Sequence, residues 1–149
     1  MSLAEWKNNG WLKEHRTSRQ EIANLFAIIH RDLADSRSVQ LSSDWRFGIA
    51  YNAVLKLCTV LLAVQGYRAE KGLAHYRTIQ ALPMILGSKT KADAAYLDMC
   101  RIKRNTVEYD MAGVATNSDA EELIAYVDEL AREVEAWLHA NHPTLLKDK

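Results

Sequence analysis

Hydrophobic residues recur at the period of an α-helix along most of this chain, so the sequence predicts a series of amphipathic helices. The clearest stripe belongs to the last helix, which we expect to begin at Ser118 as its N-cap. Its apolar residues follow 3-4-3-4-3 spacing: Ala120, Leu123, Val127, Leu130, Val134 and Trp137. This spacing is typical of a helix that packs alongside another helix in a bundle. An earlier stripe predicts a helix that begins after the capping residues Thr17 and Ser18 and ends near Ser36.

The segment 45–65 is apolar nearly all round, which predicts a helix at the centre of the bundle. Ser42 or Ser43 begins this helix, with Asp44 in the first turn, and Gly66 ends it. Three polar side chains interrupt it: Tyr51, Asn52 and Lys56. A buried amide or phenol must find a hydrogen-bond partner, so these interruptions are informative.

Two further helices are expected before the last one. The first spans about 73–86 and is kinked or ended by Pro83. The second begins at Thr90 and ends near Gly113, and its small and apolar stripe predicts a core-facing side: Ala95, Met99, Ile102 and Thr106. No segment alternates as a strand does. The prediction is an all-α, up-and-down bundle of about five helices.

The polar face of the 90–113 helix is the most unusual feature of the sequence. Arg101, Asn105 and Tyr109 stand one turn apart, with Arg104 and Glu108 beside them. Two arginines three residues apart repel one another, and helix stability does not require them. A bound anion or an acidic partner explains them, and a solvated basic face is the alternative.

The length of 149 residues fits one domain, and we divide it into an arm or short helix over 1–17, a helical domain over 18–141 and a tail over 142–149. Lys and Arg together number 19, as do Asp and Glu, which argues against a general binder of nucleic acid or membrane surfaces. The charge is nevertheless segregated. Residues 68–104 contain eight basic and three acidic side chains, whereas 118–138 contain seven acidic and one basic.

The sequence contains no motif for a metal or a cofactor and no pattern of paired cysteines. The two cysteines, Cys58 and Cys100, lie in apolar helical patterns and are expected to be core thiols in a reducing, cytoplasmic setting. We expect neither a signal peptide nor a membrane-spanning segment, because the amino end lacks a basic-then-apolar run and the longest apolar run, 54–64, contains Lys56. No glycine-rich phosphate loop, His-Glu-x-x-His, Cys-x-x-Cys or Glu-x-x-His pair occurs, so no metal and no cofactor is expected.

The polar face resembles the signature region of HEPN domains, small all-α bundles of prokaryotic defence and toxin–antitoxin systems. The resemblance rests on Arg101-x-x-Arg104-Asn105-x-x-x-Tyr109 at the end of the penultimate helix. Other segments agree with one bacterial branch of the family in order and spacing: Asp44-Trp45-Arg46, Tyr51-Asn52-Ala53, Gly66-Tyr67-Arg68 and Gly72 followed by His75. It spans roughly residues 19–137.

This resemblance implies a metal-independent endoribonuclease that works as a homodimer, with the two signature helices meeting at a shared cleft. Active members carry an Arg, usually a polar neighbour, and a His four to six residues after the Arg. Arg104 matches the Arg and Asn105 the neighbour, but Tyr109 stands where the His is expected. A phenol with a pKa of about 10 is a poor base at neutral pH, so His75 is the alternative source of an imidazole.

Two interpretations therefore remain from the sequence. In the first, the protein binds RNA or a nucleotide phosphate, either as a variant ribonuclease or as a non-catalytic binder. Its candidate catalytic residues are Arg104, Asn105, Tyr109 and His75, and its candidate ligand-binding residues are Arg101, Asn52, Tyr51 and Asp44. In the second, it is a non-catalytic interaction protein whose basic face docks an antitoxin or the acidic last helix of a second copy. A purely structural role is a further alternative, in which Asn105 and Tyr109 satisfy one another or Asn52 in a buried polar cluster and Arg101 pairs with Glu108 or with the last helix.

Overall fold

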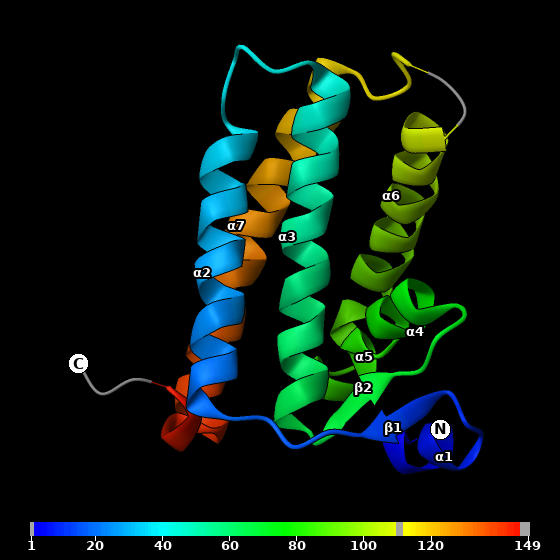
Figure 1. The fold of residues 1–149 in the computed structure, drawn as a ribbon, viewed down its shortest axis with the longest axis vertical. Helices are drawn as coiled ribbons and strands as arrows, with labels where there is room; N and C mark the ends of the chain where they lie inside the picture. Colours follow the sequence, from blue (N-terminus) through cyan, green and yellow to red (C-terminus); the bar gives the residue numbers. More distant parts are fainter. Residues whose placement is uncertain (1, 110–111, 147–149) are drawn as a thin grey trace.

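The structure is a computed structural model that describes residues 2–109 and 112–146, with the side chains of 108 and 109 left out. It confirms an all-α bundle (Figure 1). Four long helices dominate the described part: α2 (Arg19–Ser36), α3 (Ser43–Val64), α6 (Lys91–Tyr109) and α7 (Asn117–Asn141). The shorter elements are α1 (Leu3–Asn8), β1 (Leu12–Glu14), β2 (Tyr67–Ala69), α4 (Ala74–Gln80), α5 (Leu82–Leu86) and two 3-10 turns, η1 (Ser88–Thr90) and η2 (Pro143–Leu145).

Helix α3 is the centre of the core, as its apolar sequence predicts. It packs along α2 and α7, while α6 stands on its other side (Figure 1). By length and composition α3 could cross a membrane, but 72% of its most apolar window is buried inside the bundle. The predicted stripe of α7 is buried from Ala120 to Val134, and Trp137 packs half-buried against the same core.

Side-chain caps determine where the long helices begin. Ser18 and Ser42 accept hydrogen bonds from the backbone N–H groups of Glu21 and Trp45, as expected for N-caps. The last helix begins earlier than predicted, because Thr116 and Asp119 form a reciprocal capping box two residues ahead of Ser118.

The N-terminal arm contains a strand that the sequence pattern did not reveal. β1 and β2 pair antiparallel, with Lys13 opposite Arg68. Each strand has three residues, too few for an alternating pattern to be visible. The guanidinium of Arg77 on α4 lies 4.3 Å from the ring centroid of Trp11, so the arm also contacts the helix that follows β2.

Helix α6 is rotated relative to the sequence prediction. The predicted core stripe faces solvent: Met99 is 69% exposed, Ile102 is 54% exposed and Ala95 is exposed as well. A second stripe, on another side of the same helix, is buried instead: Ala94, Leu97 and Cys100. Both sides of this helix are apolar, so the pattern alone could not decide which one faces the core.

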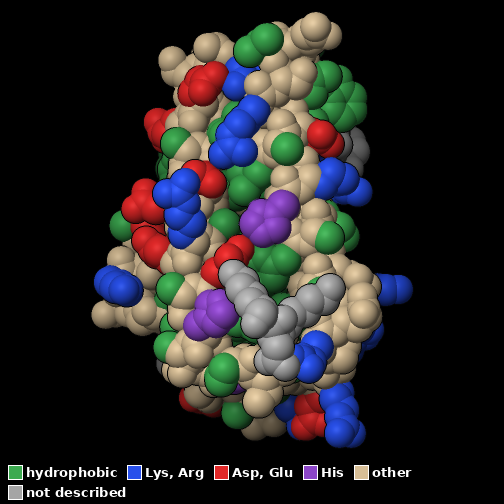
Figure 2. Space-filling model, turned by 90° about the vertical axis from the view of Figure 1, so that its left-hand side faces the viewer, with side chains coloured by type: hydrophobic (Ala, Val, Ile, Leu, Met, Phe, Trp, Pro, Cys, Tyr) green, Lys and Arg blue, Asp and Glu red, His purple; other side chains and the backbone are tan. Residues whose placement is uncertain are grey.

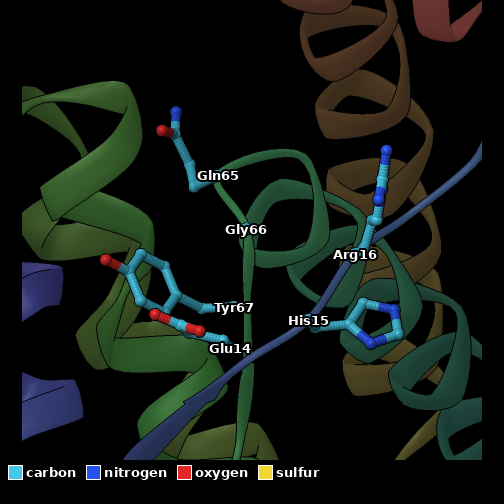
Figure 3. A pocket seen from close by; sticks show the side chains of 6 residues that line it. All are labelled: Glu14, His15, Arg16, Gln65, Gly66 and Tyr67. Carbon is cyan, nitrogen blue, oxygen red and sulfur yellow. The ribbon is translucent and has the colours of Figure 1, made fainter.

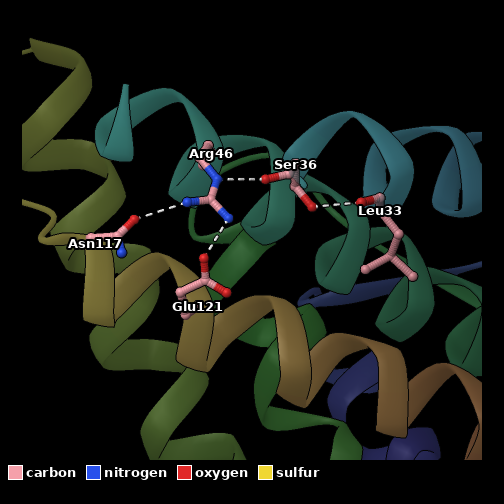
Figure 4. Close-up of polar contacts among 5 residues, drawn as sticks. All are labelled: Leu33, Ser36, Arg46, Asn117 and Glu121. Atoms are coloured by element: carbon pink, nitrogen blue, oxygen red, sulfur yellow. Dashed lines mark hydrogen bonds and ion pairs between the residues drawn. The ribbon is translucent and has the colours of Figure 1, made fainter. Parts of the chain in front are cut away.

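Arg46 joins three helices from inside the bundle (Figure 4). Its Nε donates to the Ser36 carbonyl at the end of α2 (2.9 Å), Nη1 donates to Asn117 (2.9 Å) and Nη2 to Glu121 (2.8 Å). The side chain is only 7% exposed, and its hydrogen bonds satisfy a helix-terminal carbonyl that would otherwise be buried. Arg46 is therefore a structural residue.

Several acidic side chains of α7 form ion pairs within the fold. Asp119 pairs with Lys103, Glu121 with Arg46, Asp128 with Arg37 and Arg132, and Glu135 with His30. On the face built by α2 and α7, acidic and basic side chains lie among one another, and hydrophobic ones show mostly in small groups (Figure 2).

Candidate functional site

Four of the predicted site residues lie together where α3, α4 and α6 meet: Tyr51, His75, Arg101 and Arg104. The Tyr51 hydroxyl lies 3.4 Å from Nδ1 of His75, and their ring centroids are 6.2 Å apart. Cζ of Arg104 lies 5.7 Å from the centroid of the Tyr51 ring, within the range of a cation–π contact. We refer to these four residues as the Tyr51 cluster.

The local sequence explains this convergence. Arg101 and Arg104 are three residues apart, so both project from one side of α6. His75 and Tyr76 belong to the first turn of α4, which packs against both α3 and α6. Tyr76 meets the second guanidinium, since Cζ of Arg101 lies 5.6 Å from its ring centroid. Each arginine of the cluster therefore lies over an aromatic ring.

The cluster runs from the core to the surface. Tyr51 is 1% exposed, the two arginines are half-buried and His75 is exposed. His75 and the two guanidiniums are therefore accessible from the surface, whereas Tyr51 is not.

Burial and neighbouring charge set the protonation states of the cluster. Burial raises the pKa of the Tyr51 hydroxyl well above its ordinary value, although Arg104 and Arg101 oppose the shift. Burial also lowers the pKa of His75, and the positive charges of Arg104, Lys56 and Arg101 lower it further. At neutral pH the phenol therefore keeps its proton and the imidazole is neutral.

Sequence analysis did not include three neighbours of the cluster among the site residues: Lys56, Tyr76 and Asp98. Nε of Arg101 donates to Asp98 Oδ1 at 2.7 Å, and both side chains are 22% exposed. This pair, rather than α7, is the ion pair that the described structure gives Arg101. The i, i+3 spacing of Asp98 and Arg101 was the available signal. Lys56 was visible only as a polar interruption of α3.

Asn52 and Asp44 lie outside the cluster. The amide of Asn52 donates to Asp32 Oδ2 on α2 at 2.7 Å, and Asp32 is 5% exposed, so Asn52 helps to join α2 and α3. Asp44 accepts hydrogen bonds from the backbone N–H groups of Gly113 (2.6 Å) and Ala115 (3.0 Å). Asp44 thus holds the segment that leads into α7.

The remaining two predicted residues are on α6. Asn105 is half-buried one turn beyond Arg101, between the side of α6 that carries the arginines and the exposed side that carries Ile102. Tyr109 ends the helix, and its side chain lies outside the described residues.

An open pocket of about 530 Å³ lies at the C-terminal end of α3, where the N-terminal arm crosses the turn into β2. It is lined by Glu14, His15, Arg16, Gln65, Gly66 and Tyr67. The side chains diverge, with Tyr67 and Glu14 on one side, His15 and Arg16 on the other, and Gln65 directed away (Figure 3). His15 Nε2 is engaged with Glu21 at 2.7 Å. This pocket lacks the converging polar groups of a ligand site.

Exposed apolar side chains occur on two of the elements that build the cluster. On α6 and at the start of α4 four large side chains are exposed: Leu73 (62%), Tyr76 (38%), Met99 (69%) and Ile102 (54%). Leu73 also has a φ of +52°, in the left-handed region that costs a leucine roughly 1–2 kcal/mol. We refer to these four residues as the α4–α6 apolar surface.

Among the described residues, no three His, Cys, Asp or Glu side chains come together as a metal site would need. In comparisons with known proteins no family model matches the chain, and no curated protein or solved structure matches it either. The geometry of the Tyr51 cluster is therefore the main guide to function.

Proposed function

We propose that the Tyr51 cluster binds a phosphate group of RNA or of a nucleotide. The observation that supports this proposal is the convergence of Arg101, Arg104 and His75 above the buried Tyr51. Guanidinium groups present several N–H donors in a plane that matches phosphate oxygens, and the imidazole can add one more. Phosphate contacts of this kind supply affinity without reading sequence.

The proposed biological class is that of a HEPN-like protein of a toxin–antitoxin or defence system. The resemblance around Arg104, Asn105 and Tyr109 supports this class. Metal-independent RNA cleavage is the activity that such a protein would have if a base were available. Arg104 and Arg101 would stabilise the charge on the phosphorane, and Tyr109 and His75 are the candidates for proton transfer.

The test is RNA binding and cleavage by the purified protein in a chelating buffer. Fluorescence anisotropy with labelled single-stranded RNA measures binding, and gel electrophoresis of the same RNA measures cleavage. We expect Arg104→Ala to weaken binding at least about tenfold, since charge-assisted contacts contribute about 1.5–3 kcal/mol each. Arg132→Ala is the matched control, because Arg132 is an arginine with an 80% exposed side chain on α7, away from the cluster.

Each outcome has a definite meaning. Cleavage that survives chelation and disappears in Arg104→Ala establishes a metal-free nuclease. Binding without cleavage, lost in Arg104→Ala and kept in Arg132→Ala, establishes a binding protein. Equal binding by both variants, or no binding by the wild type, contradicts the proposal.

We propose that the partner is a second copy of this chain, docked on the side of α6 that carries Met99 and Ile102. Ala95, Met99 and Ile102 are exposed and Thr106 is half-buried, and these four residues follow 4-3-4 spacing along one side of α6. The stripe is symmetric about its midpoint, so an antiparallel copy of α6 would place Ile102 against Met99 and Ala95 against Thr106. Self-complementarity of this kind is what a two-fold dimer requires.

Light scattering after gel filtration tests this partner. We expect a mass near twice the 16.9 kDa of the chain, and Ile102→Glu should reduce it to that of the monomer. Val39→Glu is the control, because Val39 is 87% exposed in the connection between α2 and α3. A wild-type monomer, or a dimer that tolerates Ile102→Glu, would overturn this assignment.

The α4–α6 apolar surface also favours a second function, that of an interaction protein that binds an antitoxin-type partner. Leu73 is the observation that favours it, because an exposed leucine with a strained backbone contributes no stability to the isolated chain. Monomeric protein with no affinity for RNA would favour this function over phosphate binding.

A further inference from the structure

The contact between Tyr51 and His75 determines which ring nitrogen of the imidazole carries its proton. A neutral histidine has one N–H donor and one acceptor nitrogen, and hydrogen-bond partners select between the two tautomers. The Tyr51 hydroxyl is buried, and among the described residues its hydrogen-bond partner is Nδ1 of His75. A buried hydroxyl that accepted from Nδ1 would leave its own O–H unsatisfied, at a cost of about 1–3 kcal/mol.

We infer that Tyr51 holds His75 in one tautomer: the phenol donates to Nδ1, so the ring proton resides on Nε2, the ring nitrogen that Tyr51 does not contact. Tyr51 is then a positioning residue. It contacts no ligand but determines what the exposed imidazole offers to one.

This tautomer makes the site a set of donors. Nε2–H of His75 joins the N–H groups of Arg101 and Arg104, so each of these three residues presents hydrogen to a phosphate oxygen. With Nδ1 occupied and Nε2 protonated, the ring has no lone pair available to take a proton from a ribose 2′-hydroxyl. The inference deepens the proposed phosphate-binding function, on which its role for Nε2 rests, and it assigns His75 to binding rather than to base catalysis.

The tautomer can be measured without any ligand. Long-range proton–nitrogen NMR correlation distinguishes the two ring nitrogens of a histidine, and the chain has only five histidines. The His75 signals are assigned by their disappearance in His75→Gln. At about pH 8, above the usual histidine pKa, we expect the wild type to show Nε2–H and Tyr51→Phe to show a mixture of tautomers. Wild-type protein with the proton on Nδ1 would overturn the inference.

A pair of substitutions tests the role of Nε2 in binding. The amide nitrogen of Gln can occupy the position of Nε2, whereas that of Asn is closer to the position of Nδ1. With sulfate as the probe, we expect His75→Gln to keep the dissociation constant within about twofold and His75→Asn to raise it about tenfold. Equal losses in both variants would contradict the donor role.

The two experiments separate the inference from the function on which it rests. If sulfate and RNA do not bind the wild type, the proposed function fails, and the NMR measurement still decides the tautomer. If they bind but His75 carries its proton on Nδ1, the function stands and the role of Tyr51 is wrong. Thermal unfolding of each variant shows whether it is folded before its binding is compared.

Discussion

The hydroxyl of Tyr51, a residue only 1% exposed, lies 3.4 Å from the imidazole of the exposed His75. This contact connects the central helix of the core to the surface at which Arg101 and Arg104 lie. A buried phenol in an otherwise apolar helix lowers the stability of a core unless its hydroxyl is satisfied. The contact therefore explains why a tyrosine is tolerated within the apolar pattern of α3.

The charge of His75 predicts a pH dependence of anion binding. Burial lowers its pKa, as do Arg104, Lys56 and Arg101, and Asp98 is the acidic group on the same side of α6. Protonation at low pH adds a positive charge to the site, so sulfate affinity should rise about fivefold as the pH falls below the ordinary value near 6.5. Calorimetric titration from about pH 8 to about pH 5 measures it. His75→Gln should remove most of the dependence, and an equal dependence in that variant would contradict the assignment.

The lowered pKa of His75 also predicts how the stability of the protein without ligand changes with pH. A histidine whose pKa is lower in the folded state contributes stability above its unfolded pKa, and this contribution is lost as the pH falls through the folded value. His75 is exposed, so the effect is expected to be small. The wild type should lose more thermal stability than His75→Gln between about pH 7 and about pH 5 in sulfate-free buffer. The reverse order would contradict the lowered pKa.

The left-handed backbone at Leu73 predicts that glycine is more stable than alanine at this position. Its φ of +52° suits glycine, which adopts this region without steric cost, and the side chain is 62% exposed, so its removal sacrifices little burial. Leu73→Gly should be more stable than Leu73→Ala by about 1 kcal/mol. Urea unfolding of the two variants provides the comparison. A more stable alanine variant would show that the strain is absent in solution.

Substitution of Arg46 should lower the free energy of unfolding strongly. The folded fraction of the variant should bind anions as tightly as the wild type does. Arg46→Ala leaves the Ser36 carbonyl and the polar groups of Asn117 and Glu121 without their donor, and should cost about 2–3 kcal/mol. Arg46→Lys should recover little, because an ammonium group cannot place three bonds in a plane. Urea unfolding measures both costs. A loss below about 0.5 kcal/mol would place Arg46 among ordinary surface residues.

Much of the fold is predictable from the sequence because three of the long helices leave little choice of buried side: α2 and α7 each carry one apolar face, and α3 is apolar nearly all round. The stripe of α7 from Ala120 to Val134 and the all-apolar α3 lie where the pattern places them. The prediction of which side of α6 is buried was wrong, because Met99 and Ile102 form as clear an apolar stripe as Leu97 and Cys100 do. Which of the two faces the core depends on its neighbours, α3 and α4, and a single-helix pattern contains no information about them.

The site was predictable in part for a related reason. Arg101 and Arg104 share one side of α6, and this is visible from spacing alone. That His75 and Tyr51 join them depends on how α4 packs between α3 and α6. Asn52 could be recognised only as a polar residue that needs a partner, and the partner, Asp32, belongs to another helix. Tertiary placement decides such pairings.

The central claim is that the Tyr51 cluster contacts RNA phosphate, and the salt dependence of RNA affinity tests it most directly. For single-stranded nucleic acid, the slope of log affinity against log salt changes by about 0.7 for each phosphate contact. Arg104→Ala should therefore reduce the magnitude of the slope by about 0.7, while Arg132→Ala leaves it unchanged. A slope in Arg104→Ala equal to that of the wild type would mean that RNA, if it binds, binds elsewhere on the protein.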